Sequence, residues 1–499
     1  MVRLFAKSLL VGALLVVAVR AHAFSLNGPY AIAGGNVWQV ARIGYNEPPD
    51  VGGPMSAAAG EEYRWNTPNV FYAYDAAFLA FYRTRGAQEI EKAVKIINDL
   101  PAASQLNIDD YPLTGERINF RAAALGLVDL QSTALSLMLE EIGLASPSRW
   151  VFCLRQRGQP GPNRFPVFFN VIRRNYEPVI LPGNVVIGKE SPYINGHLWT
   201  YVDIVDSDNV PPGSFTINAT VDPLDFGRFD PVAASGNGFS GFGIGSYFSG
   251  LTRDDVSAIK FIYQAANQNF DAALPGSTGA GTSIVGGGGG GGGGGPWSIP
   301  QPNTNALTAT NVTTTNATGL VDPTLRIGVD KLNLVRTEYD SILGLLFTPI
   351  TNTYVETFIV TGGAVKSQKV QRVITVPDIL FTAQDLEGNA DISPIIPGVT
   401  GVAARSDTAR WVNSYTLTGG TINNAGPGVI VPPTFISFSN VGFINPDEAI
   451  GPFGNPVLGV GALPYLLIGA FDGTTNEPVI FTQGGVVTVQ DLERLALGR

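Results

Sequence analysis

The sequence is poor in the side chains that bind transition metals and form disulfides. Its 499 residues include two histidines, His22 and His197, and one cysteine, Cys153. A zinc site takes up to four ligands, mostly His and Cys, and an internal disulfide needs two cysteines. The composition therefore excludes a His- or Cys-based zinc cluster, a CxxC redox site and an internal disulfide. We predict no cofactor, with calcium as the one alternative considered below.

Long apolar runs are also scarce, and the longest lies at the N-terminus. Arg3 and Lys7 are followed by the apolar stretch 9–19 and by an A-x-A cleavage motif at 21–23. This stretch is shorter than the ~20 residues that span a bilayer. We therefore predict a signal peptide at 1–23, a mature chain from Phe24 without a transmembrane segment, and a periplasmic, cell-surface or extracellular location.

Acidic residues outnumber basic ones. Removal of residues 1–23 takes away three basic residues and no acidic one, so the formal net charge goes from −10 to −13. Such a charge argues against nucleic-acid binding. The chain has only 14% charged residues but 60 glycines and 35 prolines. This composition is typical of exported, β-rich proteins.

An unbroken run of ten glycines at 286–295 marks a boundary. Glycine loses the most backbone entropy on ordering, so such a run favours a flexible tether. Small and Thr/Asn-rich segments flank it. We predict an N-terminal domain at 24–272, a Gly/Thr/Asn-rich linker at 273–319 and a C-terminal domain at 320–499.

The N-terminal unit has an α+β pattern. Helical spacing of apolar residues predicts helices within 75–100, with Glu89 on the polar face, and within 130–144. Thr252 is a good N-cap for a third helix that ends near 266, and 149–206 reads as strands. The C-terminal unit has Gly-Gly turns, at 362–363, 419–420 and 484–485, and a terminal helix at 490–497. These turns indicate hairpins and favour an all-β, sandwich-like domain.

One segment carries a resemblance to a known family. Residues 248–263, FSGLTRDDVSAIKFIY, resemble the closing helix of matrixin metalloprotease domains, where an L-[ST]-x-D-D-V-x-x-I-x-x-[IL]-Y pattern recurs. The helix at 89–100 is similar to the first helix of that family. Residues 193–201 resemble exported bacterial proteins and imply no activity. The resemblance implies a zincin-like fold for the N-terminal unit.

The chain departs from the matrixin pattern at the catalytic helix. Those enzymes carry H-E-x-x-H-x-x-G-x-x-H, in which three imidazoles hold zinc and the Glu activates water. The equivalent helix here, Thr133 to Gly143, reads TALSLMLEEIG. The zinc ligands of the family therefore match no residue in this chain. Either the similarity is local to a capped helix, or the domain is a scaffold without metal.

Other catalytic constellations are weakly supported. His197 lies in an alternating, strand-like stretch, and no G-x-S-x-G turn presents a nucleophile, so we expect a structural or surface histidine. Paired acids occur at 61–62, 109–110 and 140–141, but sequence does not fix the separation that glycoside hydrolysis needs.

Oxygen ligands for calcium gather at Asp203, Asp206 and Asp208. They lack the EF-hand pattern, and we favour solvated turn acids there.

Residues 149–174 hold six arginines and no acid, with aromatic residues between them. Arginine beside aromatics can bind anionic sugars, lipid head groups or carboxylates. The alternative, which we favour, is pairing within the chain, with Asp203, Asp206, Asp222, Asp225 and Asp230. The candidate binding residues are Arg149, Trp150, Arg155, Arg157, Arg164, Arg173 and Arg174.

Together these patterns favour an exported, non-catalytic protein with a structural or interaction role at the cell surface or outside the cell. Its partner would be a cell-surface component, a polysaccharide or a protein. The alternative is a secreted hydrolase, either carboxylate-based or a divergent matrixin-like peptidase.

Overall fold

The computed structural model describes about three fifths of the chain. The described residues are 23–27, 62–145, 147, 151, 153–158, 168–199, 244–280, 319–339, 347–360, 363–385, 404–406, 411–413, 416–418, 421–423, 428–440, 467–483 and 485–497. Among the predicted features, the apolar part of the signal peptide, the polyglycine run and Asp203, Asp206 and Asp208 lie outside these residues.

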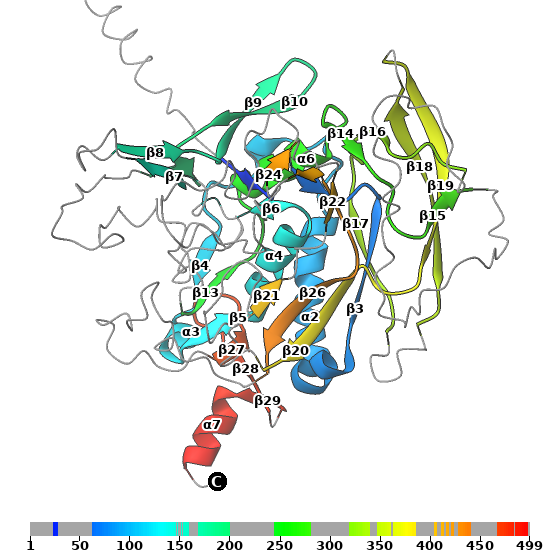
Figure 1. The fold of residues 1–499 in the computed structure, drawn as a ribbon. Coiled ribbons are helices and arrows are strands. Elements are labelled where there is room, and N and C mark those ends of the chain that lie inside the picture. The colour runs from blue at the N-terminus through cyan, green and yellow to red at the C-terminus, as the bar shows by residue number, and fades with distance from the viewer. Residues whose placement is uncertain are drawn as a thin grey trace, which may run out of the picture.

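The protein is a mixed structure with many strands and few helices (Figure 1). This secondary-structure content confirms the prediction of a strand-rich chain. The helices in the described part are α2 (Ala76–Asn98), α3 (Phe120–Ala124), α4 (Leu130–Glu141), α6 (Arg253–Tyr263) and α7 (Val489–Ala496), with the 3-10 turn η3 (Ile108–Asp110).

A five-stranded, mainly parallel sheet lies at the centre. Its order is β17–β3–β20–β26–β21, and only β21 runs antiparallel to its neighbour. Helix α2 packs on β20, β17 and β3, and α4 packs on β26 and β21. The strands are β17 (Asn333–Arg336), β3 (Asn69–Tyr74), β20 (Ile379–Gln384), β26 (Thr434–Ser439) and β21 (Ala404–Ser406).

A second five-stranded sheet is antiparallel, with the order β14–β16–β18–β19–β15. The even-numbered residues of β18 from 352 to 358 are buried, whereas Thr351, Thr353 and Val355 are exposed. The sheet therefore has one inner and one outer face. Its strands are β14 (Gln268–Asp271), β16 (Thr324–Ile327), β18 (Ile350–Ile359), β19 (Val365–Ile374) and β15 (Ser277–Gly279).

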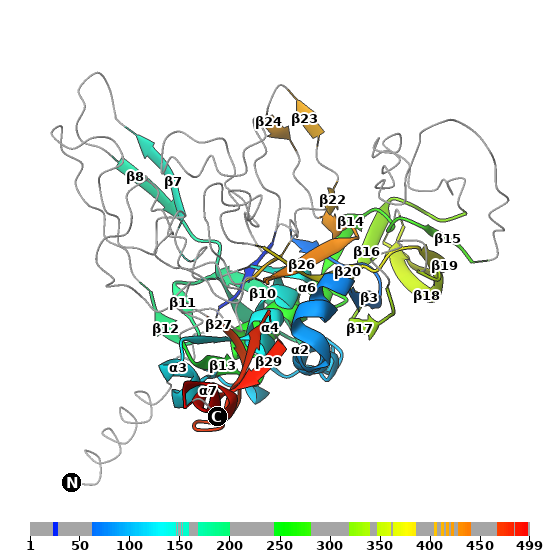
Figure 2. The same ribbon diagram turned by 90° about the horizontal axis from the view of Figure 1, so that it is seen from below.

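Smaller sheets surround these two (Figure 2). One has four strands, β29 (Gly485–Thr488), β28 (Val479–Thr482), β27 (Leu467–Ala470) and β5 (Leu127–Asp129). Another has three, β2 (Tyr63–Arg64), β25 (Gly428–Ile430) and β22 (Trp411–Asn413). The two-stranded pairs are β1 (Ser25–Leu26) with β6 (Leu144–Ala145), β4 (Glu116–Ile118) with β13 (Ser246–Phe248), β7 (Cys153–Gly158) with β8 (Phe168–Ile172), β9 (Tyr176–Leu181) with β10 (Val185–Glu190), β11 (Tyr193–Ile194) with β12 (His197–Leu198), and β23 (Thr416–Thr418) with β24 (Thr421–Asn423).

Strands from both sides of the polyglycine run share sheets. β3 lies between β17 and β20, β14 pairs with β16, and β5 pairs with β27. The prediction of an α+β unit at 24–272 and a separate β-sandwich at 320–499 is therefore corrected for the described strands. Residues 277–279 of the predicted linker form β15 and are also part of a sheet. Local patterns predict strands, but they do not encode which distant strand completes a sheet.

The predicted helices and hairpins are confirmed. Asp75 caps α2, and Thr252 caps α6 with a reciprocal capping box to Asp255. The strands that flank each Gly-Gly pair are antiparallel partners, β18–β19, β23–β24 and β28–β29. One detail differs. Glu89 is buried within α2 and forms ion pairs with Arg85 and Lys92, whereas the helical pattern places it on the polar face.

A buried arginine connects the N-terminal segment to β14 and β16, two adjacent strands of the second sheet. The two terminal nitrogens of Arg64 donate to the backbone oxygens of Ile262, Asn267 and Arg326, at 3.0–3.3 Å. They also donate to Asn267 Oδ1 at 2.8 Å and to Asp271 Oδ2 at 3.1 Å. Both side chains of the Arg64–Asp271 pair are fully buried. Arg64 therefore fixes β2 against β14, β16 and the end of α6.

We expect Arg64→Leu to lower the free energy of unfolding by about 3–5 kcal/mol, because it leaves Asp271 buried without this partner. The matched control is Arg85→Leu, which removes a half-exposed arginine from its ion pair with Glu89 and should cost about 1 kcal/mol or less. Denaturant unfolding of the two variants measures the difference. Equal losses would show that Arg64 is not a specific link.

Candidate functional site

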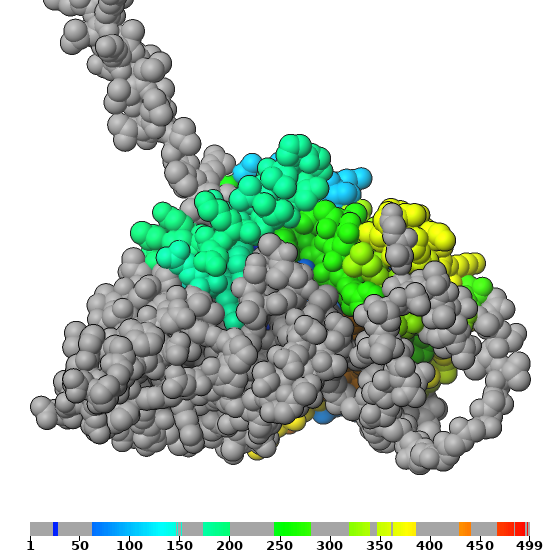
Figure 3. All heavy atoms as spheres, turned by 45° about the horizontal axis from the view of Figure 1, so that its top comes forward, coloured from blue at the N-terminus to red at the C-terminus, as the bar shows by residue number. Residues whose placement is uncertain are grey.

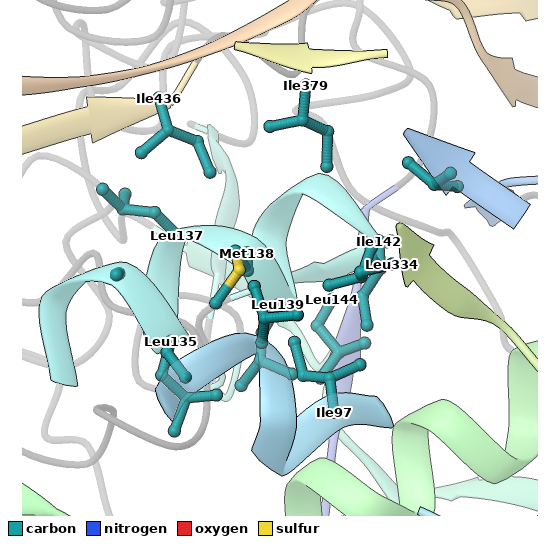
Figure 4. Packing of buried hydrophobic residues seen from close by; sticks show 14 of the residues in the cluster. Ile97, Leu135, Leu137, Met138, Leu139, Ile142, Leu144, Leu334, Ile379 and Ile436 are labelled. Carbon is teal, nitrogen blue, oxygen red and sulfur yellow. The ribbon is translucent and has the colours of Figure 1, made fainter. Parts of the chain in front are cut away.

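Helix α4 contains most of the segment 133–143, which lacks the histidines of the matrixin zinc-binding motif. Ten of its twelve residues are buried, and Gln131 and Glu140 are half-buried. Figure 4 shows Leu135, Met138 and Leu139 among core side chains that include Ile97 of α2 and Ile436 of β26. Gly143 ends the helix turn with φ +111°, and a Cβ there would meet the Tyr63 carbonyl oxygen. In the part of the chain that the structure describes, no group of three or more His, Cys, Asp or Glu side chains could hold a metal ion.

The start of α4 carries a buried carboxyl group. Asp129 accepts hydrogen bonds from the Ser132 backbone N–H at 2.8 Å and from Ser132 Oγ at 2.6 Å. Burial raises the pKa of Asp129 to about 7, with a smaller contribution from Glu89, although the Ser132 hydrogen bonds oppose the shift. The folded chain therefore retains a proton that the unfolded chain releases near pH 4.

This predicts a pH dependence of stability. Between about pH 4 and 7 the folded state binds more protons than the unfolded state, so the free energy of unfolding falls as the pH rises. Asp129→Asn keeps the N-cap oxygen without the charge and should reduce this fall. Asp129→Ala is the control. It also loses the N-cap oxygen, so its free energy of unfolding should lie about 1 kcal/mol below that of Asp129→Asn at every pH. Urea titrations from pH 4 to pH 8 test this, and an unchanged slope for Asp129→Asn would contradict it.

The polar residues at the start of α6 are all used within the fold. Thr252 and Asp255 form the capping box. Asp254 is fully buried and accepts from the backbone N–H groups of Ala23, at 2.9 Å, and Asn195, at 2.6 Å. Burial raises the pKa of Asp254 to about 7 and also raises the pKa of Asp255. One helix end therefore holds the segment at residue 23 and the turn at residue 195.

Arg253 and Lys260 extend from the same helix to the loop at 106–112. Arg253 Nε donates to the Tyr111 carbonyl oxygen and Arg253 Nη2 to that of Asp109, each at 3.2 Å. Its Nη1 lies 3.2 Å from Asp109 Oδ1. Buried Lys260 donates to the Leu106 carbonyl oxygen at 2.5 Å. α6 thus positions the loop that contains η3.

This loop forms one wall of an open groove of about 400 Å³. Ile96 and Leu100 at the end of α2 and Leu251 before α6 supply apolar surface. Asp99 and the exposed side chains of Glu116 and Arg117 supply charge. Tyr111 is half-buried, and burial raises the pKa of its phenol with a contribution from Asp110, so its hydroxyl stays protonated as a donor. The full lining is Ile96, Asp99, Leu100, Tyr111, Pro112, Thr114, Gly115, Glu116, Arg117, Ser249, Gly250 and Leu251.

The arrangement suits binding of a ligand with both apolar and polar groups. Two of the charged side chains are already engaged. Asp99 Oδ2 accepts from Lys95 Nζ at 2.6 Å, and Glu116 Oε1 accepts from Ser246 Oγ at 2.6 Å. The Glu116 contact joins the groove rim to β13, so its position depends on the β4–β13 pair.

If Arg253 holds the wall, Arg253→Met should loosen residues 109–115 and leave the core unchanged. A hydrogen bond from a charged donor contributes about 1.5 kcal/mol, so local amide exchange should be roughly tenfold faster. Lys92→Met removes a half-exposed cation from α2 and serves as the control. Hydrogen exchange read by mass spectrometry measures both variants. Unchanged amide exchange at 109–115 would show that contacts other than those of Arg253 hold this wall of the groove in place.

Within the part of the chain that the structure describes, the acids and the histidine singled out from the sequence do not form one site. His197 lies in β12, opposite Ile194, and is exposed. Asp109 pairs with Arg253, and Asp110 accepts from Asn107. Glu62 and Glu141 are buried. Cys153 is at the start of β7, opposite Ile172.

The arginine-rich segment is described only in part. Arg155 and Arg157 lie in β7, and Arg173 is exposed after β8. Arg174 is buried, at 1% exposure, and its carbonyl oxygen accepts from Ser25 Oγ at 3.0 Å. Arg174 is therefore corrected from a surface candidate to a residue of the interior. Arg149, Trp150 and Arg164, together with the predicted aspartate partners, lie outside the described residues.

The groove was missed at the sequence level. Its residues come from 96–117 and 249–251, and they carry neither a motif nor regular spacing. The sequence feature nearest to the groove is the LTRDD segment at 251–255. From the resemblance it was expected to begin a helix, and it was not predicted to line a binding site.

No protein-family model, curated protein sequence or solved structure matches the chain. Among the helices that the structure describes, none has the length and apolar character needed to cross a membrane.

Proposed function

We propose that this protein is an exported, non-catalytic interaction protein that binds a partner in the groove between α2, the η3–β4 loop and the β13–α6 loop. The A-x-A motif after a short apolar run supports export. In this proposal the N-terminal part is a matrixin-like scaffold without zinc, and the C-terminal strands complete its sheets.

The observation that carries the proposal is the burial of α4. A catalytic helix must expose its ligand-bearing face to substrate and water. Here α4 packs against α2 on one side and against β26 and β21 on another, and leucine and methionine side chains fill the space between them. The groove lies elsewhere, at the end of α2, and combines an apolar floor with an open, charged rim.

A groove-filling substitution tests the binding site. Thr114 is an exposed groove residue, so Thr114→Arg should occupy the groove and weaken partner binding by roughly tenfold or more. Thr353→Arg places the same side chain on the exposed face of β18 and is the matched control. The probes are insoluble envelope polysaccharide, in co-sedimentation, and a library of unstructured peptides, in fluorescence polarisation. Equal binding by both variants would exclude the groove.

The same probes test the hydrolase alternative. We expect no release of soluble sugar or cleaved peptide by the purified mature chain, with or without a chelator. Turnover that a chelator abolishes would identify a divergent metallopeptidase, and chelator-resistant turnover would favour a carboxylate-based hydrolase. If the chain neither binds nor turns over any of these probes, the interaction role loses its support.

A further inference from the structure

The predicted cleavage point of the signal peptide lies inside the fold. The A-x-A motif ends at Ala23, so cleavage there leaves Phe24 as the first residue of the mature chain. Both residues are fully buried. The backbone N–H of Ala23 donates to Asp254 Oδ1 at 2.9 Å. Cleavage therefore removes one hydrogen-bond donor of Asp254 and creates a free α-amino group one residue further along the chain.

Phe24 is anchored by contacts of its own. Its backbone N–H donates to the Tyr176 carbonyl oxygen at 2.9 Å, and its carbonyl oxygen accepts from the Tyr176 N–H at 2.7 Å. The centre of its ring lies 5.4 Å from that of Phe261 in α6 and 6.2 Å from that of Tyr176 in β9. In Figure 3 the teal surface of residues 168–199 borders the green surface of residues 244–280, which include α6. The new α-amino group is therefore confined to the junction of β9 and α6.

Asp254 is a fully buried carboxyl group that accepts only from uncharged groups in the part of the chain that the structure describes. Its donors are the backbone N–H groups of Ala23 and Asn195. The neighbouring Arg253 directs its guanidinium to the 109–111 segment. A buried charge is costly unless it is paired, and burial raises the pKa of Asp254 to about 7. A cation beside Asp254 would therefore stabilise its ionised form.

The mature N-terminus supplies such a cation. One residue of chain spans at most about 3.6 Å, so the nitrogen of Phe24 lies within about 6.5 Å of Asp254 Oδ1. An α-amino group has a pKa of about 8 and is mostly protonated at pH 7. Cleavage also removes the Ala23 atoms next to Asp254, which leaves room for the carboxylate to turn toward the ammonium group.

We propose that removal of the signal peptide creates a buried ion pair between the α-ammonium group of Phe24 and Asp254. This ion pair is a maturation latch. It replaces the lost hydrogen bond of Ala23 and fixes the carboxylate whose other oxygen holds the Asn195 N–H at 2.6 Å. The turn at 195–196 is therefore more rigid in the mature chain than in the precursor. The latch rests on the export that is part of the proposed function, and it needs no ligand in the groove.

A double-mutant cycle tests the latch. One chain begins at Phe24, and its matched control begins with Met, His22 and Ala23, which keeps the Ala23 N–H as an uncharged amide. Each chain is made with Asp254 and with Asp254→Asn. Because a hydrogen bond to a charged group contributes about 1.5 kcal/mol, amide exchange at 193–198 should be roughly tenfold slower in the Phe24 chain than in the control. With Asp254→Asn this difference should vanish. Equal exchange in the two Asp254 chains, or a difference that persists with Asn, would overturn the proposal.

Titration of the α-amino group is a second test, which decides if Asp254→Asn does not fold. Competitive acetylation from pH 6 to pH 10 measures its pKa. The pKa should lie at least one unit above its usual value of about 8 in the Phe24 chain and near that value in the control. A usual pKa in both chains would contradict an ion pair. Both chains share the other titratable groups near this junction, which are Arg174, Tyr176, Arg253 and Asp255.

Sequencing of the N-terminus of the exported protein separates the latch from the export. A mature chain that begins at Phe24 supports the cleavage on which the latch depends. Retention of residues 1–23, or a different first residue, would overturn the role of cleavage even if the purified Phe24 chain forms the ion pair. A mature chain that begins at Phe24 but shows no difference in the cycle would overturn the latch and leave the proposed export in place.

Discussion

The buried polar start of α6 is the constraint on which the surroundings of the groove depend. Asp254 and Asp255 are fully buried, and an unsatisfied buried carboxyl group would be costly. Asp254 accepts from backbone N–H groups of residues 23 and 195, and one carboxyl oxygen of Asp255 accepts within the cap of its own helix. Arg253 then reaches the carbonyl oxygens of the 109–111 segment. Satisfying one helix end therefore fixes three segments that lie far apart in the sequence.

The residues that resemble the matrixin closing helix have structural contacts in this fold. The residues that carry it, from Leu251 to Asp255, serve capping, burial and loop attachment, and none of them lines a metal site in the described part of the chain. A motif of this kind specifies how a helix begins and packs. Function belongs to sites that are added to such a framework.

The sequence predicted what is local and missed what is distant. Helices α2, α4 and α6 have caps and apolar spacing within a few residues, and the Gly-Gly hairpins close over short loops. β3 instead has parallel partners some 260 and 310 residues further along the chain, β17 and β20. No local pattern encodes that pairing, which is why two separate domains were expected. The groove was missed for the same reason, because its walls meet only after α2, β4 and α6 have packed.

Helix α6 also relates the groove to the β9–β10 hairpin. Its first residue, Arg253, holds the groove wall, and Gln264 after its last turn holds the β9–β10 hairpin. Eleven helical residues extend about 16 Å. Since both ends are fixed by hydrogen bonds to a single helix, the groove and the hairpin keep a constant separation.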